Sequence, residues 1–217
     1  MSDLQQEQTS TENFIKKNQK SLTYALVAAI VLIGGFFGYT ELYQKPREAK
    51  AADAMFMAEK YFANDSSNFV LNGDGQSKGV LYIIKEFSGT KAANLAKYYA
   101  GVSYFRMNDF NKSIEYLKDF STDAKQIQAV AYGTLGDAYA SLNKVDEAVS
   151  HYKKAGEYFP EDEAISSEYL FRAAAYLELN NKTDEAIELY TKIKNEYPKS
   201  EKGFMADKYI NRLKIQP

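Results

Sequence analysis

The sequence contains no cysteine and no tryptophan, one histidine, and only four prolines among 217 residues. The absence of cysteine excludes disulfide bonds, thiolate metal sites and thiol catalysis. The scarcity of proline suits a chain that is mostly helical, because proline breaks helix interiors. Without tryptophan, large apolar volume must come mainly from 18 tyrosines and 13 phenylalanines.

The chain also lacks an excess of either charge. It carries 27 Lys and Arg residues against 29 Asp and Glu residues, interspersed along the sequence, for a net charge of −2. A nucleic-acid-binding domain usually shows a basic face. We therefore expect no nucleic-acid partner.

Residues that would carry catalysis are scarce. The only histidine, His151, precedes Tyr152 in a helical pattern, and a lone histidine there is interpreted as solvated or half-packed. The acidic run at residues 161–163 begins a helix, where carboxylates favour the helix dipole without acid–base work. No glycine-rich phosphate loop is present. We expect no catalytic residue, no metal and no cofactor, so the protein is predicted not to be an enzyme.

Long apolar runs are absent, with one exception. The stretch from Leu22 to Thr40 reads LTYALVAAIVLIGGFFGYT and holds no charged residue. Roughly 20 apolar residues in a helix cross a hydrocarbon core of about 30 Å. Residues 21–41 are therefore predicted to form one transmembrane helix, with Tyr24, Tyr39 and Tyr43 near its two interfaces.

Two other interpretations of this run stay open. A cleaved signal peptide usually has a shorter apolar region and a small-x-small cleavage site, whereas this run ends in Gly38-Tyr39-Thr40-Glu41. A buried core helix of a soluble protein is the second alternative. Gly34 and Gly38 allow close helix approach and hence a homodimer, although glycine is simply common in membrane helices.

The charges that flank the run do not decide its orientation. Three basic residues precede the run and three follow it, at positions 16, 17, 20, 45, 47 and 50. We expect the N-terminus on the inner side of the membrane, because short N-terminal tails are generally not carried across it. This places the rest of the chain on the outer side.

The polar residues 1–20 show no apolar period, and we expect a disordered or frayed tail. A helical pattern covers residues 47–63, a loop rich in Asn, Asp, Ser and Gly covers 64–79, and the helical pattern resumes from Val80 to Phe87. The sequence Asn72-Gly73-Asp74-Gly75 resembles part of a calcium loop, but position twelve is Ile83 instead of an acid. An ordinary turn is the preferred interpretation.

From Lys91 onward, helical segments alternate with short turns, which predicts antiparallel neighbours. The predicted helices cover residues 91–107, 110–120, 126–142, 146–159, 161–179, 184–197 and 201–214. Two segments repeat: AYGTLGDAYASLNKVDEAVSHYKKAGEYFPE begins at Ala131 and YLFRAAAYLELNNKTDEAIELYTKIKNEYPK begins at Tyr169. A looser copy begins at Lys97.

This pattern resembles the tetratricopeptide repeat, a helix–turn–helix unit that is about 34 residues long. The best copy fills all eight signature positions, with Tyr132, Leu135, Gly136, Tyr139, Ala148, Tyr152, Ala155 and Pro160. The later copy matches at Ala173, Tyr176, Ala186, Tyr190, Ile193 and Pro198 if one extra residue is allowed in the turn 180–183. The earlier copy matches at Gly101, Tyr104, Ser113, Leu117 and Phe120.

The resemblance implies an all-α chain: one transmembrane helix followed by a tetratricopeptide-repeat α-solenoid. The predicted layout is a tail (1–20), the membrane helix (21–41) and a repeat domain (42–217). The repeat domain would hold a degenerate leading pair (47–90), three repeats (94–125, 129–162 and 166–200) and a capping helix (201–215). In the cap, Phe204, Tyr209 and Ile210 are expected to cover the last repeat, with Lys202 and Arg212 in water.

The arrangement also resembles a narrower group, the YfgM-like membrane-anchored proteins of bacteria. The residues that carry this resemblance are FIKKNQK, the apolar run, and AEKYFANDS, NGDG and GTKAANLAKYYAG after it. The resemblance implies the bacterial inner membrane, a repeat domain on the periplasmic side, and the Sec translocon and periplasmic chaperones as partners.

Repeat arrays form an extended concave face, which in the tetratricopeptide family is lined by the first helix of each repeat. The expected partner-binding groove consists of Tyr98, Val102, Phe105, Arg106, Asp137, Leu170 and Leu177. The Lys and Asn residues with which some family members clamp a terminal carboxylate are missing. The predicted function is a membrane-anchored adaptor that binds proteins or peptides. The alternative is an assembly scaffold for an envelope or cell-wall complex.

Overall fold

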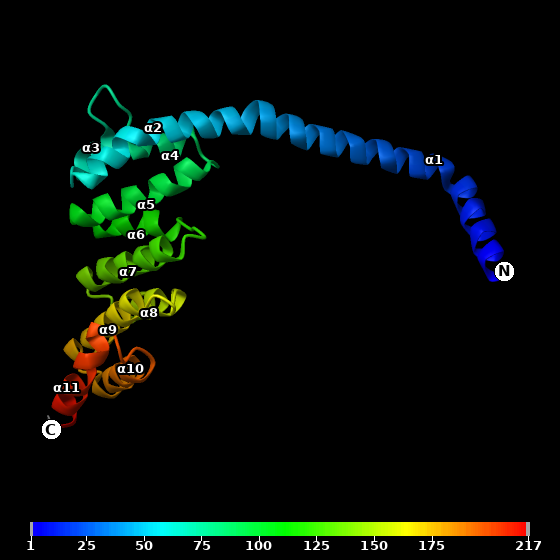
Figure 1. Cartoon of the computed structure of the whole chain (residues 1–217). Coiled ribbons are helices and arrows are strands. Elements are labelled where there is room, and N and C mark those ends of the chain that lie inside the picture. Colours follow the sequence, from blue (N-terminus) through cyan, green and yellow to red (C-terminus); the bar gives the residue numbers. More distant parts are fainter. Residues whose placement is uncertain (1, 216–217) are drawn as a thin grey trace. The chain divides into compact units, whose positions relative to one another are not determined.

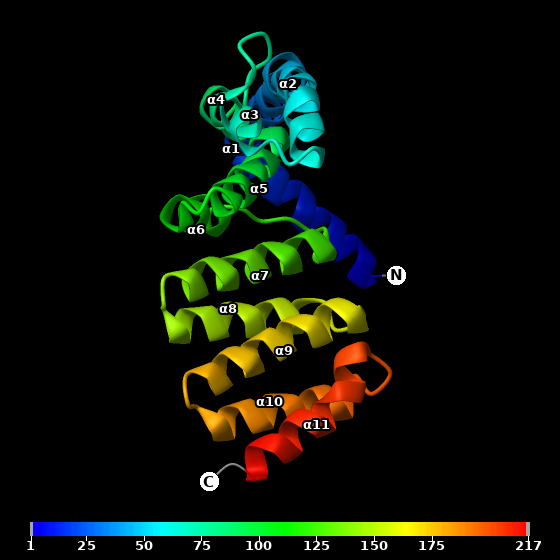
Figure 2. The same ribbon diagram turned by 90° about the vertical axis from the view of Figure 1, so that its left-hand side faces the viewer.

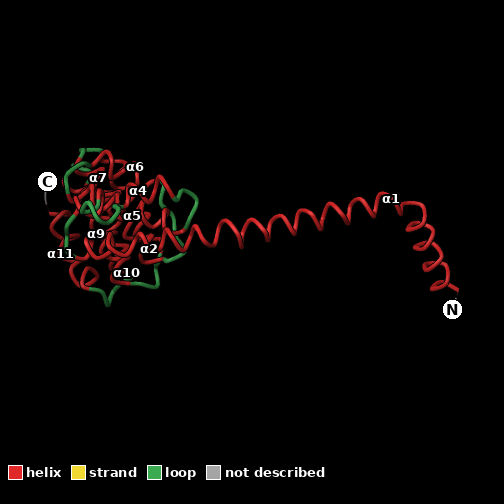
Figure 3. Tube along the Cα trace, turned by 90° about the horizontal axis from the view of Figure 1, so that it is seen from above, coloured by secondary structure: helices red, strands yellow, loops and turns green. Residues whose placement is uncertain are grey.

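The computed structural model describes residues 2–215, with side chains from residue 16 onward. The described chain is helical, with short loops and one isolated β-bridge, and it contains no strand (Figure 3). It divides into two compact units, of which the first ends at Lys50 and the second begins at Ala51.

The first unit is helical throughout. Helix α1 covers Ser2–Tyr39, the π-helix η1 covers Thr40–Gln44, and α2 (Lys45–Ala63) follows directly. The expectation of a disordered tail over residues 1–20 is wrong, because α1 begins at Ser2. The chain from Lys16 to Ala63 is long and apolar enough to cross a membrane, and its apolar window is not buried inside the structure.

The second unit is a stack of helical hairpins that follow one another in chain order (Figures 1 and 2). After α2 come α3 (Ser67–Asn72), α4 (Val80–Glu86), α5 (Lys91–Arg106), α6 (Phe110–Lys118), α7 (Lys125–Ser141), α8 (Val145–Tyr158), α9 (Glu163–Leu179), α10 (Thr183–Glu196) and α11 (Glu201–Ile215). From α5 onward, each helix begins and ends within two residues of the predicted bounds.

A residue with positive φ ends the first helix of each hairpin. These residues are Asp65, Asn108, Asn143 and Asn181, with φ values of 53°, 62°, 56° and 60°. Asn and Asp tolerate this left-handed conformation better than other non-glycine residues. The four turns between first and second helices therefore share one geometry.

The same hydrogen bonds close all four helices. The residue after each positive-φ position donates its N–H to the carbonyl five residues earlier, which is the Schellman pattern of helix ends. These bonds run from Ser66 to Tyr61, from Asp109 to Tyr104, from Lys144 to Tyr139 and from Lys182 to Leu177, at 2.9–3.0 Å.

A small residue lies seven positions before each positive-φ residue, at Ala58, Gly101, Gly136 and Ala174. All four are buried. A Cβ on Gly136 would lie 2.5 Å from the ring of Tyr152, so the first helix approaches the second here too closely for a larger side chain. The close approach of the two helices explains why the repeat signature requires a small residue at this position.

The alignment of the third repeat needs a correction. The extra residue expected in the turn 180–183 is not there, because this turn has the same geometry as the others. Helices α7 (Lys125–Ser141) and α9 (Glu163–Leu179) both have 17 residues, so one constant offset aligns them from end to end. The added length falls earlier, in α8, which has 14 residues where α6 has 9 residues.

The correction changes which residues are equivalent. Leu177, not Tyr176, occupies the place of Tyr139, and Ala174 occupies the place of Gly136. Tyr176 instead donates its hydroxyl to the carbonyl of Ala140, 3.0 Å away in the preceding repeat.

The leading pair contains an insertion. The predicted loop 64–79 is helical in part, because α3 occupies Ser67–Asn72. The segment 73–79 forms a small hairpin loop with a bridge between Gly73 and Lys78. Helices α3 and α4 thus replace the single second helix of the other hairpins.

Two clusters of buried apolar side chains form the core of the second unit. The first joins α2, α3, α4 and α5, and includes Val70 and Ile83. The second extends from Leu117 in α6 to Leu213 in α11. The division falls within the α5–α6 hairpin.

Helix α11 caps the last hairpin through Ile210 and Leu213, which are buried, and through Tyr209, whose ring stacks on Tyr190 at 5.1 Å. The expectation for Phe204 is wrong, because this side chain is 76% exposed. Lys202 and Arg212 form ion pairs to α9, described below, instead of extending freely into water.

Candidate polypeptide-binding face

The first helices α5, α7 and α9 present their outward side chains at equivalent positions, and we call this surface the first-helix face. None of its residues is buried. They are Leu95, Tyr99, Val102 and Arg106 from α5, Val130, Thr134, Asp137 and Ser141 from α7, and Glu168, Arg172, Ala175 and Leu179 from α9.

The predicted groove residues of α5 pack largely within the chain. The half-buried Tyr98 ring lies 5.3 Å from that of Phe120 and 6.3 Å from that of Phe62. Phe105 contacts the ring of Phe110 at 5.7 Å. Their removal would therefore disturb packing as well as the surface. The half-buried Val102 belongs to the face and also packs against the second core cluster.

Arg106 is exposed to solvent, but its side chain contacts two residues at the end of α2. Its guanidinium lies 4.4 Å from the ring centroid of Phe62 and pairs with the carboxylate of Asp65 at 2.9 Å. Asp65 is the positive-φ residue that ends α2. Arg106 thus ties α5 to the end of the preceding first helix.

A chain of polar contacts crosses the face from α7 to α11. The hydroxyl of Tyr152 donates to Asp137 at 2.7 Å, and the guanidinium of Arg172 contacts both oxygens of the same carboxylate at 3.1 and 3.2 Å. Arg172 also donates to Glu168 at 2.8 Å, and Glu168 pairs with Lys202 at 3.3 Å. Asp137 therefore links its own repeat to the next one.

These contacts shift the pKa values of Tyr152 and Glu168. Burial and the carboxylate of Asp137 raise the pKa of Tyr152, so its hydroxyl remains a donor. Burial opposes ionisation of Glu168, but Arg172 and Lys202 hold the pKa of Glu168 below its usual value. A second cross-repeat pair joins Arg212 to Glu178.

Leu170 and Leu177 cannot line a groove, because their side chains are 0% and 2% exposed. Both lie in the second core cluster. The error follows from the misplaced extra residue, since a shift of one residue turns a helix face by about 100°. With the register corrected, Glu168, Arg172, Ala175 and Leu179 take the outward positions on α9.

Sequence reasoning missed Glu168, Arg172 and Tyr169. Glu168 and Arg172 stand four residues apart, a spacing at which opposite charges pair on a helix, and this signal was available. Tyr169 fills the space over Gly133, where a Cβ would lie 2.0 Å from the tyrosine ring. Burial raises the pKa of Tyr169 to about 12.

A pocket of about 590 Å³ opens at the N-terminal ends of α5 and α7. Leu95, Phe120 and Ile127 supply its apolar lining, and Thr90 and Asn94 also line it. Ile127 is 38% exposed. An apolar side chain of a bound segment would fit here, next to Leu95 of the face.

Residues suited to metal chemistry do not cluster. Within the residues searched, no three His, Asp or Glu side chains are placed to hold an ion. In the loop that resembles a calcium site, Asp74 accepts hydrogen bonds from the Tyr61 hydroxyl and from the N–H groups of Gln76 and Ser77. His151 stacks on Tyr139 at 5.2 Å, and burial together with Lys154 and Lys118 lowers its pKa.

Comparison with known families agrees with this repeat geometry. Residues 95–124 and 168–200 match one tetratricopeptide repeat family, and residues 129–162 match another of the same description. The two matches to the same family begin at Leu95 and Glu168, which the corrected register places at equivalent positions of α5 and α9. The chain thus contains three tetratricopeptide repeats, and α2–α4 form a leading hairpin outside the matched residues.

Among solved structures, the chain is similar to a crystal structure of nearly identical TPR-like repeats from a Podosopora anserina protein described as a kinesin light chain. The similarity has a TM-score of 0.53 at 12% identity and covers 76% of this chain and 86% of the other. It shows the fold alone. No curated protein matches the sequence. The predicted all-α tetratricopeptide solenoid, with one apolar helix before it, is confirmed.

Proposed function

We propose that this protein is a membrane-anchored adaptor whose first-helix face binds a segment of a partner polypeptide. Tetratricopeptide repeats generally mediate protein–protein contacts, and extended peptides or helices are the usual occupants of such faces. The observation that carries the proposal is the row of unburied side chains at equivalent positions of α5, α7 and α9. The fold also gives no support to catalysis.

The face suits a polypeptide more than a small molecule. The two acidic groups of the face, Asp137 and Glu168, are paired with Arg172 and Lys202, so neither carboxylate needs a counter-ion from a ligand. Apolar side chains such as Val102, Val130 and Leu179 also belong to the face. A bound segment would cover apolar surface and meet polar groups with fixed geometry, as at protein interfaces.

The anchor is proposed from α1. Its side chains from Leu22 to Phe37 are exposed and uncharged. Near its end, the rings of Tyr39 and Tyr43 lie 5.3 Å apart, and Arg47 lies 5.7 Å from the ring of Tyr43. Aromatic and basic residues are enriched at membrane interfaces, which supports a spanning helix with this end at one surface.

The location and partners are proposals by resemblance. We infer a bacterial inner membrane, with the N-terminus inside and the repeats on the periplasmic side, and partners in protein translocation or periplasmic chaperoning. An assembly scaffold for an envelope or cell-wall complex is the alternative. Self-association through Gly34 and Gly38 also stays a prediction.

Labelling tests the topology. Because the chain has no cysteine, Lys208→Cys on the exposed surface of α11 provides a unique thiol. An impermeant maleimide added to intact cells should label it. Labelling only after the cells are opened would contradict the proposed orientation.

Affinity capture tests the face. The double variant Val102→Lys with Ser141→Lys places two charges on the first-helix face. Because the half-buried Val102 also packs against the second core cluster, helicity is measured alongside capture. The variant should lose the partners that the native chain retains from solubilised membranes, while helicity stays unchanged. The control, Glu115→Lys with Glu188→Lys, alters exposed positions of α6 and α10 and should retain them. Equal capture by both variants would exclude the face as the binding surface.

Translocon subunits and chaperones among the retained proteins would favour the first role. Cell-wall synthases would favour the scaffold role.

A further inference from the structure

The pocket at the N-terminal ends of α5 and α7, hereafter the α5–α7 pocket, lies beside a helix that ends early. Helix α6 has 9 residues, whereas the second helices α8 and α10 have 14 residues each. The loop 119–124 then leads to α7, and its residues 120–123 form one wall of the pocket. The pocket volume of about 590 Å³ lies within the range of roughly 300–1,000 Å³ typical of ligand sites. A large apolar side chain therefore has room to enter.

Apolar side chains that line this pocket remain accessible. Ile127 is 38% exposed, and Leu95 is half-buried. Phe120 is buried, with its ring 5.3 Å from the ring of Tyr98. Ile127 and Leu95 thus supply apolar surface that a ligand can cover.

The polar side chains of the lining are engaged within the chain or balanced in charge. The Thr90 hydroxyl caps α5 as a hydrogen-bond acceptor, and the Asn94 amide donates to the carbonyl of Ser121 at 2.7 Å. The charged residues of the lining are one base and one acid, Lys91 and Asp123, so the lining carries no net charge. An ion of either sign gains no advantage here.

The same place in the last repeat has the opposite chemistry. The corrected register makes Leu95 equivalent to Glu168, which lines a pocket of about 450 Å³ where α9 and α11 begin. Glu168 pairs there with Lys202 at 3.3 Å. The α9 residues that line this pocket are the equivalents of Thr90, Lys91, Asn94 and Leu95, namely Glu163, Ala164, Ser167 and Glu168. Equivalent positions thus form an apolar wall on α5 and an ionic wall on α9.

Polar contacts bridge the equivalent place between α7 and α9. Lys125 pairs with Glu161 at 3.5 Å, and the amide of Gln126 donates to Asp162 at 3.0 Å. Lys125 and Gln126 are the equivalents of the first two lining residues of α5. The apolar character of the α5–α7 pocket is therefore not shared by the two other junctions of the first helices.

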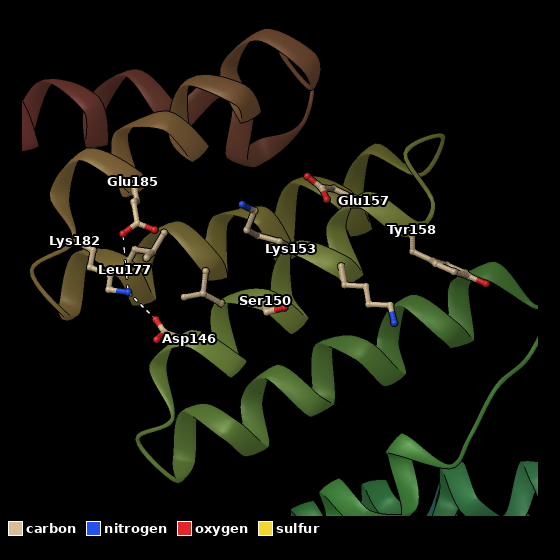
Figure 4. Close-up of a pocket in the computed structure, with 10 residues that line it drawn as sticks. Asp146, Ser150, Lys153, Glu157, Tyr158, Leu177, Lys182 and Glu185 are labelled. Carbon is tan, nitrogen blue, oxygen red and sulfur yellow. Dashed lines mark hydrogen bonds and ion pairs between the residues drawn. The ribbon is translucent and has the colours of Figure 1, made fainter.

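A further pocket, between the second helices α8 and α10, also differs from the α5–α7 pocket (Figure 4). Its aliphatic lining residues, Val149 and Leu177, are only 9% and 2% exposed. Lys182 pairs with Asp146 at 2.7 Å and with Glu185 at 4.0 Å, as the dashed lines in Figure 4 show. This pocket therefore offers little aliphatic surface to a ligand.

We propose that the α5–α7 pocket holds an apolar side chain of the polypeptide that binds the first-helix face, and that this contact sets the register of the bound segment. The inference rests on the proposed function, because Leu95 belongs to both the face and the pocket. An aliphatic or aromatic side chain would cover Leu95 and Ile127, whereas a charged one would leave water for an apolar lining. Because the equivalent junctions are polar, the apolar side chain fits the face in one register.

Disulfide tethering tests the chemistry of the pocket without a partner. The cysteine-free chain with Ser121→Cys, in lipid nanodiscs that leave no detergent to compete, is equilibrated in a thiol buffer with two probes. The probes are the disulfides of isocaproyl-cysteamine, which is apolar, and of γ-hydroxybutyryl-cysteamine, which is polar. Intact-mass spectrometry should show at least about fivefold more adduct with the apolar probe, because its branched alkyl end is buried.

Matched variants locate the preference. Ile127→Ser should abolish it, whereas Ile215→Ser, at an exposed apolar position of α11, should leave it unchanged. Lys199→Cys, in the equivalent pocket of the last repeat, should show less than about a twofold preference. Equal adducts of the two probes at Ser121→Cys, or an equal preference at Lys199→Cys, would overturn the proposal.

Affinity capture separates this inference from the proposed function. Ile127→Ser should retain at least about fivefold less of the partners that the native chain captures from solubilised membranes, whereas Ile215→Ser should retain them. If Val102→Lys with Ser141→Lys loses the partners but Ile127→Ser keeps them, the pocket is overturned and the face stands. If both keep them, the proposed function fails and this inference fails with it.

Crosslinking in native membranes identifies the occupant. A benzophenone on Ser121→Cys should form adducts with polypeptides other than the chain itself, and Ile127→Ser should reduce their yield. Adducts only with lipid, or only with a second copy of the chain, would overturn the proposal.

Discussion

Single residues set the turn geometry that repeats along the chain. Asn108, Asn143 and Asn181 each adopt a left-handed conformation at the end of a first helix. The short polar turns at residues 107–109, 142–144 and 180–182 are evident in the sequence, and they correctly predicted where the first helices end. The conformation within each turn became evident only from the structure.

Asn143 should accept glycine but not a β-branched residue. Asn143→Gly should leave stability within about 0.5 kcal/mol, whereas Asn143→Val should cost about 1–3 kcal/mol, because valine strains the left-handed backbone. Urea denaturation measures both. Asn211→Val, at an exposed position inside α11, is the matched control and should cost less than about 1 kcal/mol. Equal losses at both positions would contradict the strain argument.

Tyr169 should make the fold sensitive to alkaline pH. Burial raises its pKa to about 12 from an ordinary value of about 10, so the folded state favours the neutral phenol. This contribution is fully present below pH of about 10 and is lost as the pH rises toward about 12. Tyr169→Phe should therefore show a shallower loss of stability over this range, measured by urea denaturation at each pH. A parallel loss in both proteins would contradict the assignment.

At the scale of elements, the sequence predicted the helices from α5 to α11 well but misplaced the register of α9. The spacing of Pro160 and Pro198 gave the distance between the ends of successive second helices. It did not show at which point of the repeat the residues beyond the usual repeat length are inserted. The residue pattern of α9 allowed either register, because Ala173 and Ala174 are both small. The turn at Asn181 and the burial of Leu170 and Leu177 distinguish them.

Substitutions on α9 should separate the two registers. Leu170→Ala removes a fully buried side chain and should cost about 2–5 kcal/mol. Leu179→Ala removes one that is 77% exposed and should change stability by less than about 0.5 kcal/mol. Thermal or urea denaturation measures the difference. Similar costs at the two positions would contradict the corrected register.

At the scale of the whole molecule, the chain combines an exposed apolar helix with a repeat domain whose buried core is divided. The sequence predicted both parts. It could not predict the division between the clusters around Val70 and Leu117, because this depends on the shortness of α6 and on the broken second helix α3–α4. The ion pair between Asp137 and Arg172 could not be predicted from sequence spacing either, since the two residues come from different repeats.

The divided core predicts local unfolding. In repeat proteins, stability is approximately a sum of repeat and nearest-neighbour terms. Val70→Ala should therefore speed amide hydrogen exchange in α2–α5 while leaving α9–α11 protected, and Ile193→Ala should do the reverse. Hydrogen exchange followed by mass spectrometry measures both. Uniform acceleration along the chain in either variant would indicate one cooperative core.

The central claim is that the first-helix face binds a polypeptide at a membrane, and site-specific photocrosslinking in native membranes tests it most directly. A benzophenone on Ser141→Cys, in the otherwise cysteine-free chain, should yield discrete polypeptide adducts. The same group on Glu188→Cys, on the exposed surface of α10, should not yield these adducts. Recovery of the Ser141→Cys adducts from membranes, and their loss in the presence of Val102→Lys, is the predicted result. Identical adducts from both positions, or none from Ser141→Cys, would contradict the account.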